Sequence, residues 1–106
     1  MNNIPDSFFW HDGNVSALNY ATKNKITTLK IEAAFYAHDL ASERSEYTLS
    51  CQDVTKFNHI VDFNEINDNS SAGSISNGYL KGNTLWLYLS DGIIEINAKE
   101  FNLKKH

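Results

Sequence analysis

Two dipeptides in this sequence pair a histidine with an aspartate, the residue types that proteins use for acid–base catalysis and for metal binding. They are His11-Asp12 and His38-Asp39. A metal-dependent phosphohydrolase needs further histidine and aspartate ligands that converge on one point, and this chain has four histidines in all. On a strand, the two side chains of either dipeptide would point to opposite faces. We therefore expect no catalytic residue and no metal site, with His11 and Asp12 forming a polar cluster at a turn.

Nucleophilic catalysis and phosphate binding have no clear signature either. Cys51 is the single cysteine, has no basic cluster near it in sequence, and alternates with Leu49 and Tyr47, so we expect a small buried hydrophobic residue. The sequence contains no Gly-x-Ser-x-Gly motif, and its five glycines are scattered singly. The chain is therefore expected to be neither an enzyme nor the holder of a cofactor.

The clearest structural pattern lies in residues 82–98, where apolar and other side chains alternate with the period of a strand. Leu85, Leu87 and Leu89 alternate with Trp86 and Tyr88, and Ile94, Ile96 and Ala98 alternate with Glu95 and Asn97. Asp91-Gly92 lies between the two runs. This dipeptide predicts a β-hairpin with a type I′ turn, because glycine tolerates the positive φ that such a turn needs.

Further strands are predicted on both sides of a central region that is difficult to interpret. The predicted strands cover residues 15–20, 26–36, 47–52 and 74–81, and residues 8–10 form a short aromatic strand or anchor. From Val54 to Ile66, apolar residues recur at spacings of three and four. We predict that the preceding strand ends near Val54 and that a short helix covers His59–Ile66.

Together these patterns predict one domain that covers residues 1–106. The chain is long enough to bury a core without disulfides, and its aromatic-rich composition favours strands. The predicted fold is all-β, or β-rich α+β: an antiparallel sandwich or partly open barrel of about six to eight strands with at most one short helix.

The charge balance excludes some classes of partner. Nine Lys and Arg residues stand against thirteen Asp and Glu residues, giving a formal net charge of −4. An acidic surface repels nucleic acid and favours a basic protein partner. No apolar run is long enough to cross a membrane, and the first residues lack the pattern of a secretory signal. A cytoplasmic location is expected.

Two groups of residues are candidates for partner binding. Trp86 and Tyr88 project from the face opposite the leucines of their strand, and large aromatic side chains dominate binding hot spots. Tyr20 and Tyr36 are candidates for the same face, unless a helix or residues 8–10 cover it. The second group is acidic and comprises Asp62, Glu65 and Asp68, in a stretch whose only basic residue is Lys56.

The motif Phe9-Trp10-His11-Asp12-Gly13, the long alternating strand after it and the closing Asp91–Ala98 segment carry a resemblance. The chain resembles small β-rich bacterial proteins of unknown function, many of which accompany polymorphic or contact-dependent toxins as immunity proteins. The resemblance implies an inhibitor that binds one cognate toxin. An acidic surface would suit a toxin with a basic active site, such as a nuclease.

Our leading hypothesis is therefore a non-catalytic, cytoplasmic protein-binding domain that acts as an immunity protein. One alternative is a small-molecule-binding β-barrel with its ligand among Trp10, His11, Tyr36 and Tyr79. Another is an enzyme that uses His11 and Asp12. A structural domain that pairs with a second copy through its exposed aromatic face is the remaining alternative.

Overall fold

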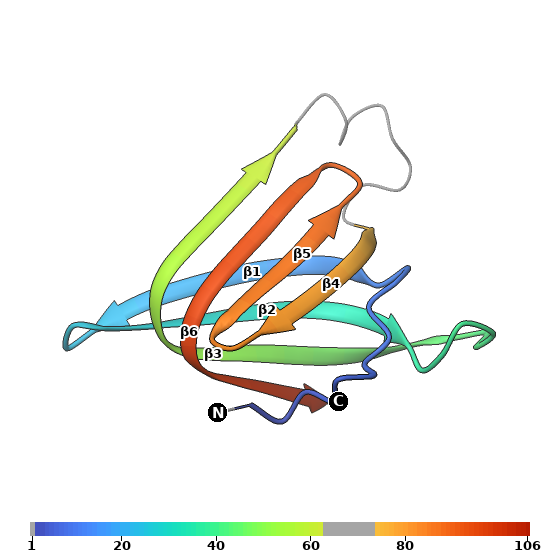
Figure 1. Ribbon diagram of the computed structural model, residues 1–106, viewed down its shortest axis with the longest axis horizontal. Helices are drawn as coiled ribbons and strands as arrows, with labels where there is room; N and C mark the ends of the chain where they lie inside the picture. Colours follow the sequence, from blue (N-terminus) through green and yellow to red (C-terminus); the bar gives the residue numbers. More distant parts are fainter. Residues whose placement is uncertain (1, 63–73) are drawn as a thin grey trace.

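The computed structural model describes residues 2–62 and 74–106, and all the regular structure in these residues is β-strand (Figure 1). The strands are β1 (Asn14–Lys23), β2 (Ile26–Tyr36), β3 (Arg44–Val61), β4 (Ile75–Lys81), β5 (Thr84–Leu89) and β6 (Gly92–Lys105). They form one antiparallel sheet in the order β1-β2-β3-β6-β5-β4. The predicted all-β antiparallel fold is confirmed. Within the described residues, no helix is long and apolar enough to span a bilayer.

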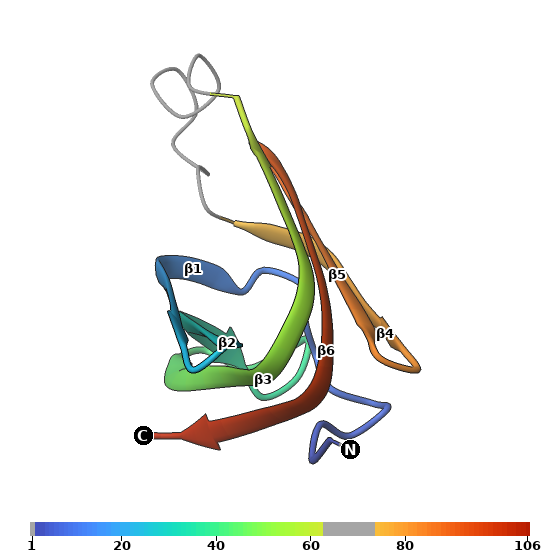
Figure 2. The same ribbon diagram turned by 90° about the vertical axis from the view of Figure 1, so that its left-hand side faces the viewer.

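The sheet folds over on itself because its two longest strands, β3 and β6, bend together (Figure 2). Thr55 is an extra residue in β3 that shifts the β3–β6 register between Val54 and Lys56. Such a bulge increases twist and bends a strand. Close by, Asp53 adopts a φ of 53° and pairs with Lys99 at 3.1 Å. The bend separates a β1–β2 half of the sheet, which includes the start of β3 and the end of β6, from a β4–β5 half.

The two halves bury one hydrophobic core between them. The inward-facing side chains alternate along each strand as the sequence predicts. The largest fully buried members are Leu29 and Ile31 of β2, Cys51 of β3, Ile75 of β4, Leu85 and Leu87 of β5, and Ile94 and Ile96 of β6. Because the core draws on strands from both halves, neither half has a core of its own.

The first and last strands of the sheet order meet only at one end. Asn14 of β1 forms an isolated antiparallel bridge with Ser74, and the backbone of Ile75 accepts from Asp12 at 2.8 Å and donates to Gly13 at 2.7 Å. Beyond this contact the edges of β1 and β4 are not paired with each other in the described residues. The architecture is therefore a partly open barrel.

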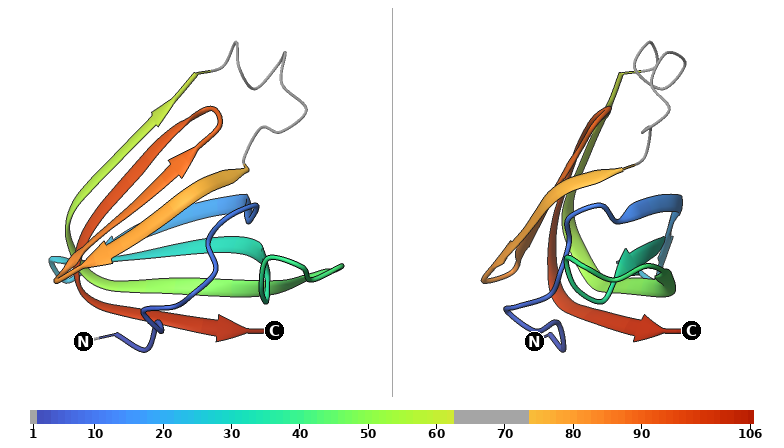
Figure 3. Two further views of the ribbon diagram at one scale, coloured as in Figure 1. Left: turned by 45° about the vertical axis from the view of Figure 1, so that its right-hand side comes forward. Right: turned by 90° about the vertical axis from the view of Figure 1, so that its right-hand side faces the viewer.

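The N-terminal segment, residues 2–11, crosses the open side of this barrel (Figure 3). Asn2 forms a parallel bridge with Phe101 of β6. Phe8 and Trp10 pack edge-to-face on Phe35, with ring centroids 5.0 and 5.6 Å away. Residues 8–10 are thus an aromatic anchor rather than a strand.

The helix predicted over His59–Ile66 is wrong for its described part. β3 does not end near Val54 but continues through the bulge to Val61, paired with β6. Phe57 and Ile60 are three residues apart, the spacing of one helical turn. On this strand that spacing places them on opposite faces, and both faces carry apolar side chains here. Residues 63–66 lie outside the described residues.

The hairpin predicted around Asp91 is present, but its turn is one residue earlier than expected. Leu89 pairs with Gly92, so the turn residues are Ser90 and Asp91, and neither has the positive φ of a type I′ turn. Gly92 is needed for another reason. A Cβ at this position would collide with the backbone carbonyl of Ile60 on β3.

Replacing Gly92 with alanine is expected to destabilise the fold by about 3 kcal/mol or more, since the collision is with the backbone of the neighbouring strand β3. Chemical denaturation followed by tryptophan fluorescence measures the change. Gly82→Ala is the matched control, because Gly82 has a φ of 59° but open space around it, and it should cost only about 1 kcal/mol. Equal losses in the two variants would contradict this close approach of β6 to β3.

Cys51 is expected to be unreactive in the folded protein. Its side chain is fully buried, and desolvation raises the pKa of the thiol to about 12. An aromatic disulfide reagent at pH 8 should therefore leave the native protein unmodified on a timescale on which the denatured protein reacts fully. Rapid stoichiometric labelling without denaturant would show that this part of the core opens easily.

Candidate functional site: an outer aromatic face

Four side chains form a continuous row across the outer surface of the β4–β5 half. Tyr79 of β4 is directly opposite Trp86 of β5, Trp86 is opposite Glu95 of β6, and Glu95 is opposite Asn58 of β3. Directly opposed residues on one face of a sheet are in contact range. The rings of Tyr79 and Trp86 accordingly lie 5.6 Å apart at 32°.

Glu95 holds this row together through hydrogen bonds. The Asn58 side-chain amide donates to one carboxylate oxygen at 2.7 Å, and the Trp86 indole nitrogen donates to the other at 2.9 Å. These two bonds, with a smaller contribution from Lys56 at 4.0 Å, lower the pKa of Glu95. The indole of Trp86 is thereby fixed in orientation, which reduces the entropy that a binding partner would have to remove.

A second row lies beside the first and is more exposed. Tyr88 of β5 is opposite Ile93 of β6, which is opposite Ile60 of β3. The exposed fractions are 51% for Tyr79, 44% for Tyr88 and 65% for Ile60. We call the surface formed by Tyr79, Trp86, Tyr88, Ile93 and Ile60 the aromatic face.

In Figure 1, no described segment crosses in front of β4 or β5. The alternative that residues 8–10 cover this face is wrong, since Phe8 and Trp10 pack into the core instead. Tyr20 does not share the face. It lies on the inner side of β1 against Phe57, with a ring distance of 6.0 Å. Tyr36 lies in the β1–β2 half, where the Arg44 guanidinium covers its ring at 4.7 Å.

Of the three predicted acidic residues, only Asp62 falls within the described residues. Asp62 is exposed, and its backbone N–H donates to the carbonyl of Asp91 at 2.7 Å. This bond places it beside the β5–β6 turn, at the same end of the sheet as Tyr88. Glu65 and Asp68 lie outside the described residues.

The predicted polar cluster exists as a local arrangement. His11 and Asp12 occupy a turn, with Nε2 of His11 3.5 Å from Oδ2 of Asp12 and both side chains more than half exposed. Nδ1 of His11 donates to the carbonyl of Ser76 on β4 at 2.8 Å, which ties the N-terminal segment to that strand. His38 accepts a hydrogen bond from the N–H of Leu40 within an exposed loop. No group of three or more metal-binding side chains occurs among the described residues.

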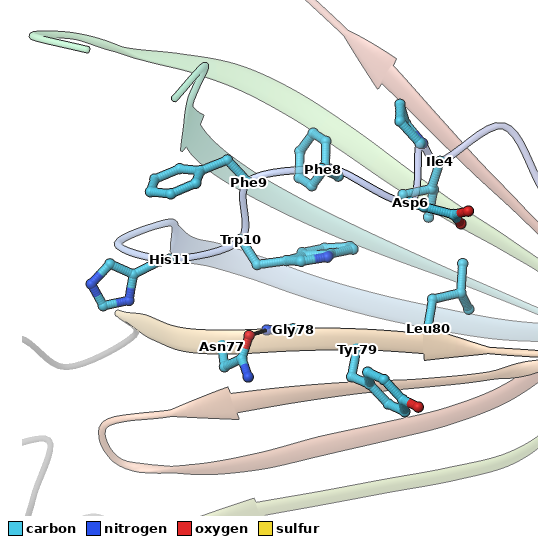
Figure 4. Close-up of a pocket in the computed structure, with 11 residues that line it drawn as sticks. Ile4, Asp6, Phe8, Phe9, Trp10, His11, Asn77, Gly78, Tyr79 and Leu80 are labelled. Carbon is cyan, nitrogen blue, oxygen red and sulfur yellow. Dashed lines mark hydrogen bonds between the residues drawn. The ribbon is translucent and has the colours of Figure 1, made fainter. Parts of the chain in front are cut away.

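A groove with a volume of about 520 Å³ lies between the N-terminal segment and β4 (Figure 4). Trp10, His11 and Tyr79, three of the four residues predicted for a small-molecule site, line it, whereas Tyr36 does not. The space inside the curve of the sheet holds the core side chains, so this groove lies at the edge of the barrel rather than in its interior.

Comparisons of the chain with protein-family models, with curated proteins and with solved structures gave no match. The resemblance to immunity proteins remains a prediction.

The residues that surround Trp86 in the aromatic face were not predicted from the sequence. Uninterrupted alternation along β4 would place Tyr79 on the same face as Ile75, but Ser76 is an extra residue in β4, so Ile75 lies inside and Tyr79 outside.

The indole N–H of Trp86 offers a direct measurement of the Glu95 titration. Because the folded pKa of Glu95 lies below the unfolded value of about 4.3, its contribution to stability is complete above that value and is lost as the pH falls through the folded pKa. We expect the Trp86 indole resonance to shift with a midpoint below 4.3 in an NMR titration. Glu95→Gln should abolish this transition. A midpoint at or above 4.3 would contradict the two hydrogen bonds.

Proposed function

We propose that this chain is a non-catalytic protein-binding domain that docks its partner on the aromatic face. The supporting observation is the register itself, which brings three aromatic and two isoleucine side chains from four strands onto one outer surface. Aromatic side chains of this kind provide much of the binding energy in protein interfaces. Tyr79 and Tyr88 also bring hydroxyl groups that can donate or accept hydrogen bonds at such an interface.

The partner that we propose is a basic protein. The chain has a formal net charge of −4, and two of its nine basic residues, Lys104 and Lys105, are at the C-terminal end. An acidic protein attracts a basic one over a distance and accelerates the encounter. Asp62 is an exposed acidic residue at the Tyr88 end of the sheet, at the rim of the proposed interface.

Within this class, the proposed role is that of an acidic cytoplasmic immunity protein that neutralises a toxin. This narrower proposal rests on the resemblance of the sequence and on its charge. It requires that binding of the partner also inhibit the partner's activity, which is a separate measurement from affinity.

Tyr88→Ala is the sharpest test of the docking face, because Tyr88 is exposed and its removal should not unfold the domain. Loss of a hot-spot side chain costs about 2 kcal/mol or more, which corresponds to a roughly 30-fold weaker Kd. Trp86→Ala is expected to weaken binding at least as much while leaving the fold intact by circular dichroism. Partners are captured from the source cells on wild-type protein, purified, and their Kd values measured by calorimetry.

The matched control is Tyr20→Ala, which removes an exposed tyrosine from the inner side of β1. A captured basic protein that binds the Tyr20 variant normally and the Tyr88 variant poorly supports the proposal. Equal binding to both variants would place the interface elsewhere. A wild-type dimer in sedimentation that dissociates on Tyr88→Ala would assign the face to self-association and would contradict the proposal.

A further inference from the structure

A second surface for interaction with another chain is the edge of β4 that faces away from β5, most of which has no strand partner among the described residues. β4 is the last strand in the sheet order, and β5 pairs with only one of its edges. On the other edge, strand-like backbone contacts occur at Ser74 and Ile75, with Asp12, Gly13 and Asn14. Unpaired strand edges are templates on which an extended segment can add as a further strand.

The hairpin between β4 and β5 determines which backbone groups face outward. Gly82 and Asn83 form a two-residue turn between the paired residues Lys81 and Thr84. In such a hairpin the closing pair is hydrogen-bonded, and hydrogen-bonded and non-hydrogen-bonded pairs then alternate. The N–H and C=O groups of Gly78 and Leu80 therefore point away from β5. They repeat about every 6.8 Å, the repeat of an extended chain.

Beyond Ile75, the backbone N–H and C=O groups of β4 that point away from β5 bond to side chains rather than to another strand. The carbonyl of Ser76 accepts from the His11 ring at 2.8 Å. The N–H of Gly78 donates to Oδ1 of its own neighbour Asn77 at 2.9 Å. That bond confirms the outward direction of the Gly78 N–H. An incoming backbone carbonyl can replace the Asn77 side chain without leaving a buried group unpaired.

The groove in Figure 4 runs along this same edge, between residues 77–80 and the N-terminal segment. Its floor includes the indole of Trp10, which is 8% exposed and packs directly against Gly78. No hydrogen bond to the Trp10 indole nitrogen is present in the described residues, and no fully buried polar side-chain atom there lacks a partner. The Trp10 indole nitrogen is therefore not fully buried, and its N–H has no acceptor among the described residues.

The charge of the groove indicates which side chains its occupant carries. Asp6 is the only acidic lining residue, no lysine or arginine lines the groove, and the other walls include Phe8, Phe9 and Trp10. A carboxylate beside aromatic rings suits a lysine or arginine side chain, through an ion pair and through cation–π contact.

We propose that this groove binds an extended peptide segment of a partner protein. The segment pairs with the outward backbone groups of Gly78 and Leu80, one of its carbonyls accepts the Trp10 indole N–H, and a lysine or arginine side chain contacts Asp6. The N–H and C=O groups of Gly78 and Leu80 repeat along the strand edge at the spacing of an extended chain, which favours a peptide over a compact small molecule. Tyr79 lines both this groove and the aromatic face, but Trp86 and Tyr88 do not line the groove. Variants at Trp10 and Asp6 therefore test this proposal separately from the proposed docking face.

The probe is a phage-displayed library of linear peptides of about twelve residues, long enough to pair along the whole edge of β4. Enriched peptides are synthesised and titrated into ¹⁵N-labelled protein. We expect the Trp10 indole resonance and the amides of Gly78 and Leu80 to shift, while the Trp86 indole resonance stays in place as an internal control. Trp10→Phe identifies which of the two indole signals belongs to Trp10.

Two variants test the contacts by calorimetry. Trp10→Phe keeps an aromatic ring but removes the N–H and should weaken peptide binding about tenfold. Asp6→Asn should weaken binding of a basic peptide about threefold at low salt and less at high salt. Asp39→Asn, in the exposed loop after β2, is the control for charge and should leave the affinity unchanged.

The proposal is overturned if no linear peptide is enriched. It is also overturned if the enriched peptides shift other residues and leave Trp10, Gly78 and Leu80 unchanged, or if they carry no basic residue and ignore Asp6→Asn. If Trp10→Phe has a fold defect, the amide shifts of Gly78 and Leu80 remain the readout, because they are measured on the wild-type protein and need no assignment from that variant.

Discussion

The bend shared by β3 and β6 is the constraint on which the rest of this structure depends. A single flat sheet of six strands could bury neither face, and its two halves find a common core only because both long strands turn at the same level. The extra residue Thr55 makes the turn possible, and its hydroxyl bonds back to the Asn97 side chain at 3.0 Å. The Asp53–Lys99 pair lies at the same level.

The same bend determines which surfaces remain exposed. Folding the sheet inward turns its concave side into core and leaves the convex side of the β4–β5 half without a cover in the described residues. It also brings the edge of β4 toward the N-terminal segment without full pairing, so a groove remains between them. The aromatic face and the groove are therefore two products of one incomplete closure, on either side of β4.

The sequence was informative wherever side-chain alternation was uninterrupted. Leu85, Leu87, Ile94 and Ile96 correctly placed Trp86 and Tyr88 on the outer face. Two of the errors coincide with a bulge or with an apolar side chain on an outer surface. Ser76 is an extra residue in β4, so the side chains after it point to the opposite face from the one that uninterrupted alternation gives, and Tyr79 lies on the outside. Ile60 was taken for part of a helix because it is an apolar residue on an outer surface.

The contacts that complete the candidate sites could not be predicted from local patterns. Glu95 meets Asn58 because β6 pairs with β3, and this pairing joins segments more than thirty residues apart. Trp10 and Gly78 are brought together by the closure of the barrel, over an even longer separation. A register between distant strands depends on the whole fold, whereas a hairpin depends on a few neighbouring residues.

The position of β6 in the sheet has a consequence for how the chain acquires its structure during synthesis. Of the six strands, β6 leaves the ribosome last, yet it lies between β3 and β5 in the strand order. Until it arrives, β1–β3 and the β4–β5 hairpin have no common partner, and both expose edges and apolar side chains. Such strand pairing between distant segments is slow. The nascent chain therefore passes through a state that is prone to aggregation until β6 is inserted between β3 and β5.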